Sequence, residues 1–504
     1  MTENLYQVFR QRFATRLPQP FLESEDGRVM TYADLDRTTA RYAERLGLLG
    51  LSKGDRLVTQ LDKTPETVCL YLACLRAGMV YVPLNTAYQP AEVDYFLADA
   101  EPAAVVCRPQ ATELMASLAG ARGVRHVLTL EAGGGGSFTE GIETLSGDYT
   151  EAAPGSEDLA ALLYTSGTTG RPKGAMMTHD LLAAKATTLA AHWGWRPEDV
   201  LLHAMPIFHT HGLFLSMHCA LASGASMIFL PRFDASSVVR LLPRATVFTG
   251  VPTMYARLVS QVGLTVEACR NMRLFISGSA PLSPETFHAF RARTGHAILE
   301  CWGMTETLTN ASNLLDGERR AGSVGFPAPG VAIRVVDDQG RPRPAGEAGM
   351  LEVRPTRRFA GYWRRPEESR ASFRPDGFFI TGDVGRLGAD GFLTIVGRAT
   401  DLIISGGYNV YPKEVETVLD RLDGVAESAV IGLPHPDLGE AVTAVVELHP
   451  GRDDLSEAAI IAALKQELAF FKVPKRVIVV HEFPRSSVGK IQKGALRERF
   501  QDTY

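Results

Sequence analysis

Strand and helix patterns alternate along the first third of the chain, and this alternation constrains the fold more than any other feature. Helical spacing covers Tyr32 to Leu49 and Pro65 to Ala77. Short apolar runs at Arg56 to Gln60 and Val80 to Pro83 are typical of strands. Because parallel neighbours need a long crossover, usually a helix, the alternation predicts α/β subdomains with largely parallel sheets.

The composition indicates a soluble globular protein. The chain has 504 residues, which is too long for one ordinary domain, with 45% hydrophobic and 22% charged residues. The formal net charge of −5 is spread over interspersed acidic and basic residues, so we expect no nucleic-acid or membrane partner. The six cysteines form no CxxC pair, and no signal-peptide core or membrane-spanning apolar run is present. We expect a cytoplasmic enzyme with free thiols.

The pattern changes twice toward the C-terminal end. From about 330 to 397, short alternating strands with turn signals predict a small β-subdomain. Beyond it, helical spacing at Pro412 to Leu422 and at Glu457 to Leu468 alternates with strand patterns. We predict an N-terminal domain over residues 1–397, built of two stacked, mostly parallel α/β subdomains plus the β-subdomain. A hinge over residues 398–401 and a small mobile α+β domain over residues 402–504 follow.

A loop rich in glycine, serine and threonine, Thr165 to Gly174, follows a predicted buried strand. Its backbone N–H groups and hydroxyls can face the oxygens of a polyphosphate together, and Lys173 adds a positive charge. The loop is not a Walker-type motif, because Pro172 and Gly174 stand where that motif requires Gly and Ser or Thr. A kinase or GTPase of that kind is disfavoured, and a surface linker is the plainer alternative.

Further polar motifs stand at predicted strand ends and loops. They are His209-Thr210-His211-Gly212, Ser277-Gly278-Ser279-Ala280-Pro281, Trp302-Gly303-Met304-Thr305-Glu306, Thr381-Gly382-Asp383, Gly397-Arg398, Ser405-Gly406-Gly407-Tyr408 and Val488-Gly489-Lys490. In this order, and with the Thr165 to Gly174 loop, they resemble the adenylate-forming superfamily of acyl-CoA synthetases, adenylation domains and luciferases. Pro206 to Phe214 and Ser312 to Arg320 resemble malonyl-CoA synthetases in particular.

The resemblance implies an ATP site with Mg²⁺. The implied ATP and AMP contacts are Thr165, Ser166, Gly167, Thr168, Thr169, Lys173, Gly278, Ser279, Ala280, Pro281, Trp302, Gly303, Met304, Thr305, Asp383 and Arg398. Glu306 and Thr168 would hold Mg²⁺, which prefers a few carboxylates plus phosphate oxygens. Trp302 replaces the tyrosine usual in the family, and we expect its indole to stack on adenine.

The resemblance also implies a catalytic lysine and a moving domain. Lys490 would bridge the incoming carboxylate and the α-phosphate, with Thr305, Glu306 and His209 completing the catalytic set. Rotation about Asp401 would then bring the CoA-binding residues toward the reaction centre. These residues are Ser405, Gly406, Gly407 and Tyr408. Acylation of Lys490 by a lysine acyltransferase, reversed by a deacylase, would remove its charge.

The acid is expected to bind near Arg257, His209, Ser279 and Met304. Arg257 lies on the second turn of a predicted helix, so it either pairs with a distal carboxylate or is an ordinary exposed arginine. His209 contacts a carboxylate of the acid or gates the thiol channel.

Two further residues belong to the same motifs as the expected acid-binding residues. We expect His211 to be structural. Cys301 stands where malonyl-CoA synthetases commonly carry arginine, which keeps other acids open.

The function predicted by this resemblance is an AMP-forming acid–CoA ligase. It would make malonyl-CoA, and also methylmalonyl-CoA, from the acid, ATP and CoA through an acyl-adenylate. The alternatives are a ligase for another small, fatty or aromatic acid, an adenylation enzyme that loads a carrier protein, and a nucleotide-binding homologue without catalysis.

Overall fold

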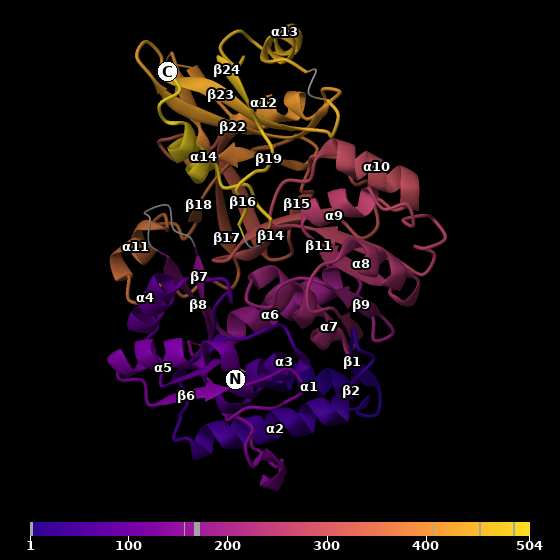
Figure 1. Cartoon of the computed structure of the whole chain (residues 1–504), viewed down its shortest axis with the longest axis vertical. Helices are drawn as coiled ribbons and strands as arrows, with labels where there is room; N and C mark the ends of the chain where they lie inside the picture. The colour runs from indigo at the N-terminus through magenta and orange to yellow at the C-terminus, as the bar shows by residue number, and fades with distance from the viewer. Residues whose placement is uncertain (1–3, 156, 166–171, 407, 453–454, 487–488) are drawn as a thin grey trace.

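The structure is a computed structural model that describes residues 4–155, 157–165, 172–406, 408–452, 455–486 and 489–504. Ser166, Gly167, Thr168, Thr169 and Gly407, which the sequence places in binding sites, lie outside these residues. Figure 1 shows the chain running from the indigo N-terminal layers at the bottom to the yellow C-terminal layers at the top.

Two large sheets form the lower part of the molecule. The first has the order β6-β5-β3-β4-β7-β8, and the second has the order β15-β14-β13-β12-β11-β9-β10-β1-β2. The strands of the first are β3 (Arg56–Gln60), β4 (Val80–Pro83), β5 (Ala104–Cys107), β6 (His126–Thr129), β7 (Leu159–Thr165) and β8 (Lys173–Thr178). Those of the second are β1 (Pro20–Ser24), β2 (Val29–Thr31), β9 (Val200–His203), β10 (Ser226–Phe229), β11 (Val247–Gly250), β12 (Leu274–Ser277), β13 (Leu299–Met304), β14 (Leu308–Ser312) and β15 (Phe326–Pro327).

The inner strands of both sheets are parallel, which confirms the α/β prediction. Parallel pairs run from β6 through β7 in the first sheet and from β1 through β13 in the second. Antiparallel partners occur only at the described edges, where β8, β2, β14 and β15 are added. Parallel strands carry their carboxyl ends to one edge of a sheet, and the motifs that begin at Thr165 and Ser277 stand at such ends, after β7 and β12.

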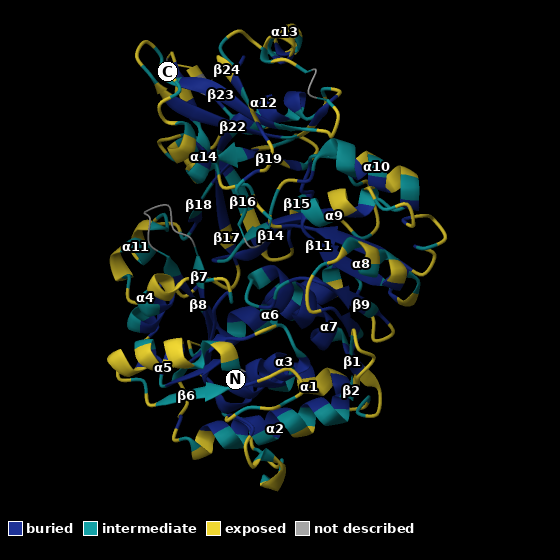
Figure 2. Cartoon of the chain, in the orientation of Figure 1, coloured by how far each residue is buried: buried dark blue, intermediate teal, exposed yellow. Residues whose placement is uncertain are grey.

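Helices cover the faces of these sheets. They are α1 (Leu5–Phe13), α2 (Tyr32–Leu48), α3 (Pro65–Ala77), α4 (Pro90–Ala100), α5 (Thr112–Ala121), α6 (His179–His192), α7 (His218–Ser223), α8 (Ala235–Leu241), α9 (Pro252–Val259) and α10 (Pro284–Thr294). Helix α3 is buried along its whole length, and its residues share one hydrophobic cluster with α6, α7 and strands of both sheets. Figure 2 shows this dark central layer and the yellow outer surface of α5.

The predicted helix ends have the expected chemistry. Thr31 and Asp34 form a capping box at the start of α2. Helix α3 begins after Thr64, whose side chain accepts from Thr67 N, and ends at Gly78 with a φ of 68°. A side chain at Gly78 would be strained, so the glycine that predicted the end of the helix is also what the turn requires.

Two further sheets lie above, one antiparallel and one mixed, since β24 joins β23 in parallel. The strands of the antiparallel sheet lie in the order β16-β17-β18-β19. They are β16 (Val331–Val336), β17 (Ala348–Pro355), β18 (Phe379–Leu387) and β19 (Leu393–Arg398), and helix α11 (Pro366–Ala371) lies between β17 and β18 in the sequence. The C-terminal sheet comprises β20 (Ile403–Ser405), β21 (Tyr408–Val410), β22 (Val425–His435), β23 (Gly439–Leu448) and β24 (Arg476–Val480). Its helices are α12 (Pro412–Leu419), α13 (Glu457–Glu467) and α14 (Lys493–Phe500). Helix α12 ends before the predicted Leu422, because the chain turns through Gly424, at a φ of 102°, into β22.

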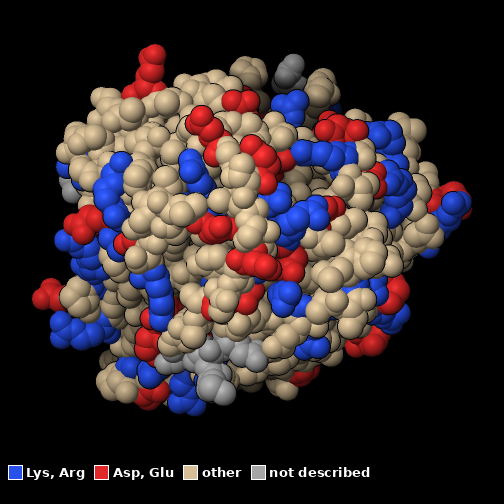
Figure 3. Space-filling view, turned by 90° about the horizontal axis from the view of Figure 1, so that it is seen from below, with Lys and Arg blue, Asp and Glu red and all other residues tan. Residues whose placement is uncertain are grey.

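The surface and the thiols agree with the composition. Figure 3 shows acidic and basic side chains interspersed over one face of the molecule. The six cysteines are buried and free, as expected. Within the described residues, none of the helices has the length and apolar character that crossing a bilayer requires.

Candidate active site

Strands β13, β18 and β19 bring Trp302, Asp383 and Arg398 together. Trp302 lies on β13, while Asp383 and Arg398 are paired neighbours on β18 and β19. The Trp302 indole Nε1 donates to Asp383 Oδ2 at 2.8 Å, and Arg398 Nε lies 2.6 Å from Asp383 Oδ1. Each carboxylate oxygen therefore has one partner and keeps lone pairs for hydroxyl groups of a ligand.

The pKa of Asp383 is set by opposing effects. Burial raises the pKa of this carboxyl, whereas the positive charges of Arg398 and Lys490 and the Trp302 hydrogen bond oppose the rise. The Trp302 contact was not predicted, since the sequence argument assigned the indole only to adenine stacking. A buried indole N–H needs an acceptor, and that requirement was the available signal.

Lys490 reaches this group from the far end of the chain. Gly489 has a φ of 78°, and a Cβ added there would lie 2.7 Å from Thr253 Oγ1. The backbone next to Lys490 therefore packs closely against the start of α9. Although part of the Lys490 side chain is exposed, burial of its ammonium and the charge of Arg398 lower its pKa, against the carboxylates of Asp383 and Asp401. The structure thus brings Lys490, Asp383 and Arg398 into one electrostatic group.

A second polar group lies at the β7–β8 hairpin. Thr165 and Lys173 are the last paired residues of its two strands, next to the loop that joins them. Lys173 Nζ lies 2.6 Å from Glu368 Oε2 and 5.1 Å from the ring centre of Tyr362. The Tyr362 hydroxyl donates to Glu306 Oε1 at 2.9 Å. Tyr362 and Glu368 stand outside the recognised motifs, so sequence reasoning missed both.

Glu306 fits the chemistry of a magnesium ligand shared with phosphate. Its carboxylate is buried and keeps one oxygen beyond the Tyr362 contact. Magnesium is usually held by one or two carboxylates plus substrate oxygens, rather than by a complete protein cage. Among the described residues, no cluster of three or more His, Cys, Asp or Glu side chains is arranged to hold a metal.

The predicted acid-binding region is electrically neutral apart from Arg257. Burial lowers the pKa of His209 to about 4 and that of His211 to about 3. Burial, followed by the nearby Glu300 carboxylate, raises the pKa of the Cys301 thiol to about 12. Met304 is partly buried at the end of β13. Near neutral pH these histidines and the thiol are therefore uncharged.

Arg257 is exposed on α9, as one of the two sequence alternatives expected. It lies one turn beyond Thr253, so the two residues share the helix face that Gly489 approaches. Within the described residues its guanidinium has no hydrogen bond or ion pair. It is therefore available to an anion without first breaking a contact.

The residue expected at the hinge, Asp401, directly precedes the C-terminal sheet, and of the residues expected at the CoA site Ser405 and Tyr408 lie on that sheet. Asp401 Oδ1 accepts from Arg497 Nη2 on α14 at 2.6 Å. Ser405 and Tyr408 are partners on the β20–β21 hairpin. The exposed Tyr408 ring stacks on Phe471 with centroids 4.5 Å apart. The hairpin therefore presents an aromatic surface to solvent.

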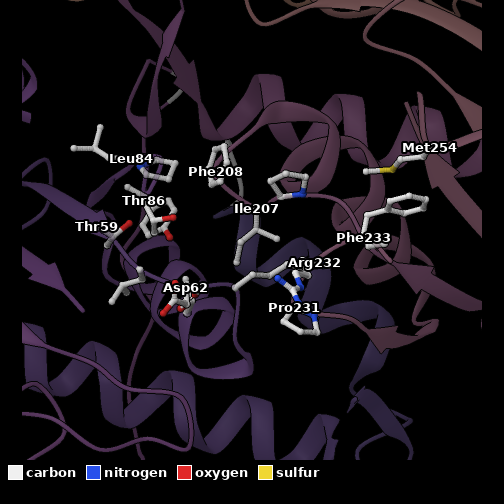
Figure 4. Close-up of a pocket in the computed structure, with 17 residues that line it drawn as sticks. Thr59, Asp62, Leu84, Thr86, Ile207, Phe208, Pro231, Arg232, Phe233 and Met254 are labelled. Carbon is white, nitrogen blue, oxygen red and sulfur yellow. Dashed lines mark hydrogen bonds between the residues drawn. The ribbon is translucent and has the colours of Figure 1, made fainter. Parts of the chain in front are cut away.

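A cavity of about 300 Å³ opens between the two large sheets, at the carboxyl ends of several strands. Figure 4 shows Thr59, Thr86 and Leu84 on one side, Ile207 and Phe208 in the middle, and Arg232, Phe233 and Met254 on the other. Lys63 also lines it and donates to the carbonyls of His203 and Leu230, at 2.8 and 2.6 Å. Phe208 directly precedes His209, so the cavity extends to the loop that carries this histidine.

Glu300, the residue before Cys301, is a buried acid that supports the loop after β12. Its Oε1 accepts from Leu282 N at 3.0 Å, and its Oε2 has no hydrogen-bond partner among the described residues. Burial raises its pKa to about 8, against the Leu282 hydrogen bond and the charge of Lys413 on α12. The folded protein therefore holds this proton more tightly than the unfolded chain.

Glu300 should make stability fall with rising pH. A raised acid pKa contributes stability that is complete below the ordinary value of 4.5 and is lost as the pH passes about 8. We expect Glu300→Gln to melt within about 1 °C of the unaltered protein at pH 5, and at least about 3 °C above it at pH 9. Thermal unfolding at both pH values measures this, and an equal difference at both would exclude the assignment.

Residues 9–363 match the model of the AMP-binding enzyme family, and residues 414–490 match the AMP-binding enzyme C-terminal domain. A malonate–CoA ligase of Arabidopsis thaliana is 34% identical over 90% of this chain and 79% of its own length. A feruloyl-CoA synthase of an Amycolatopsis species is also 34% identical, over 97% of this chain and 98% of its own.

Solved structures also resemble this chain. ATP-bound MatB from Rhodopseudomonas palustris is 48% identical over the whole of both chains, with a TM-score of 0.96. The apo form of MatB gives a TM-score of 0.85 over the same coverage. The chain belongs to the AMP-binding enzyme family and, within it, is an acid–CoA ligase of the AMP-forming class.

Proposed function

We propose that this ligase makes malonyl-CoA from malonate, ATP and CoA, and that it also accepts methylmalonate. The observation that carries the proposal is the meeting of Lys490, Asp383 and Arg398 at one site, in a chain 34% identical to a malonate–CoA ligase. The whole-chain similarity to MatB supports it.

In the first step, a carboxylate oxygen of the acid attacks the α-phosphorus of ATP, and the bond to pyrophosphate breaks. Asp383 accepts hydrogen bonds from the ribose hydroxyls while Arg398 and Trp302 hold its carboxylate in place. The Lys490 ammonium lies between the carboxylate and the α-phosphate and stabilises the charge that develops there. Backbone groups of Gly278, Ser279, Ala280 and Pro281 line the adenine, and Gly303 and Thr305 lie against the phosphate.

Magnesium would be held by Glu306 together with Thr168 and phosphate oxygens. Its charge would offset the repulsion between two anions. Lys173 lies on the same side, next to Glu368, and would exchange that partner for the β- and γ-phosphates.

In the second step, the thiol of CoA attacks the acyl carbon and AMP leaves. We propose that residues 402–504 rotate about Asp401 relative to residues 1–397, which withdraws Lys490 and brings Ser405, Gly406, Gly407 and Tyr408 inward. The higher TM-score with ATP-bound MatB than with its apo form supports an adenylation-like arrangement here. The cavity behind Phe208 provides a route for the thiol arm toward His209.

The second candidate is a ligase for an uncharged or aromatic acid. Two observations favour it: Cys301 is neutral, and a feruloyl-CoA synthase is as similar in sequence as the malonate–CoA ligase. A panel of carboxylic acids, assayed with magnesium, ATP and CoA by AMP release, separates the two. Malonate and methylmalonate should give the highest kcat/KM, and a preference for benzoate or a fatty acid would reject the proposal.

Arg257 should decide between di- and monocarboxylates. If its guanidinium pairs with the distal carboxylate of malonate, Arg257→Ala lowers kcat/KM for malonate by about 100-fold and for propionate by less than about threefold. Arg270→Ala, at an exposed arginine paired with Glu267, is the matched control. Equal losses for malonate and propionate would remove Arg257 from the acid site.

A further inference from the structure

Ser279 has an unusual backbone conformation. Its φ of 72° lies in the left-handed region, which residues with a Cβ rarely adopt. Such a conformation persists only where the surroundings stabilise it, and it is common at functional sites. Ser279 is exposed in the loop after β12, so burial of its own side chain does not provide that stabilisation.

His211 supplies the contact that Ser279 needs. Its Nδ1 lies 3.0 Å from Ser279 Oγ, and the imidazole is buried. The backbone around it is also fixed, since Ser216 Oγ donates to His211 O at 2.9 Å and His211 N donates to His209 Nδ1 at 3.3 Å. His211 begins a π-helix, His211–Met217, a feature often found at functional sites.

Packing fixes the neighbouring residue as well. A Cβ added to Gly278 would lie 2.9 Å from Cys301 Sγ and 3.6 Å from His211 Cε1. The backbone of Gly278 therefore sits closely between the thiol and the imidazole. The same imidazole packs on Gly278 and bonds Ser279, so it holds two successive residues of the loop.

We propose that His211 is a positioning residue, which clamps Ser279 in its left-handed conformation and thereby presents the backbone of Gly278 to Pro281 to the nucleotide. Because His211 also bonds His209, the clamp links the nucleotide loop to the histidine expected at the acid or thiol. The inference rests on the proposed function only in the placement of that loop against adenine.

The backbone chemistry of glycine gives a specific test. Glycine adopts a positive φ without steric cost, so a glycine at 279 needs no clamp. His211→Leu and Ser279→Ala each remove the hydrogen bond but leave a strained residue, and each should weaken AMP binding about tenfold. In the Ser279→Gly background, adding His211→Leu should weaken AMP binding by less than about twofold.

Calorimetric titration with AMP measures these affinities without any acid, so the result does not depend on the choice of malonate. AMP binding by the unaltered enzyme is measured first, and its absence would count against the proposed function itself. His218→Leu is the control, since it removes another buried imidazole, one bonded to the Tyr71 hydroxyl at 2.8 Å, and should leave AMP affinity unchanged.

Two results would overturn the clamp. One is an AMP affinity that does not change in Ser279→Ala, whose exposed position makes misfolding a minor concern even if His211→Leu fails to fold. The other is a loss from His211→Leu that is as large in the Ser279→Gly background as in the unaltered chain, which would indicate a general packing role.

Discussion

Lys490→Ala should lose adenylate formation by at least about 100-fold while still converting a synthetic malonyl-adenylate to malonyl-CoA at close to the normal rate. The ammonium stabilises charge that develops only when the carboxylate attacks phosphorus, and removing one such group commonly costs two to three orders of magnitude. Its charge interacts with those of Asp383 and Arg398, which supports our proposal that it acts in the first reaction and not at the thiol. Pyrophosphate release and thioester formation from adenylate are measured separately.

Lys465→Ala is the matched control for this experiment, because that lysine is exposed on α13 and has no role in the proposed site. It should leave both half-reactions within about twofold of the unaltered enzyme. Equal damage to both half-reactions by Lys490→Ala would contradict the division of labour between them.

Asp383→Asn should weaken nucleotide binding by about 100-fold. The substitution keeps the shape of the side chain but removes the charge that pairs with Arg398 and that, in our proposal, accepts from the ribose hydroxyls. Hydrogen bonds to a charged group are worth more than neutral ones. The KM for ATP in pyrophosphate exchange and the calorimetric Kd for AMP both measure the effect.

Trp302→Phe provides the comparison for Asp383. It keeps an aromatic ring beside the nucleotide and removes only the N–H that donates to Asp383 Oδ2, so a loss of less than about tenfold is expected. If the two variants weaken AMP binding equally, the ribose contact of Asp383 is wrong. If only Trp302→Phe does so, the indole is the principal nucleotide contact.

Local chemistry made much of the fold predictable. Thr31 and Gly78 specify helix ends through hydrogen bonds and backbone preferences confined to a few residues. The sheet that a strand joins is decided elsewhere. Strand β1 pairs with β10, which follows all the strands of the first sheet in the sequence, and the residues of β1 carry no signal for that partner. The π-helix at His211 likewise has no periodicity that distinguishes it from an α-helix.

The candidate site could likewise be predicted only in part from the sequence. Motifs named Asp383, Arg398 and Lys490, and the structure brings these three together. The partners of three other motif residues could not be predicted, because Tyr362, Glu368 and Arg497 reach Glu306, Lys173 and Asp401 only through tertiary packing. The sequence alone left two alternatives for Arg257, a partner of the distal carboxylate and an ordinary exposed arginine. In the structure it is exposed on α9, where an incoming anion can reach it.

Acid-dependent exchange of labelled pyrophosphate into ATP is the most direct measurement of the central claim, that this site joins a carboxylate to the α-phosphate of ATP. With magnesium and malonate, the enzyme should exchange label rapidly without CoA, and it should not do so when the acid is omitted. No exchange with malonate, methylmalonate or any other carboxylic acid offered would contradict the account.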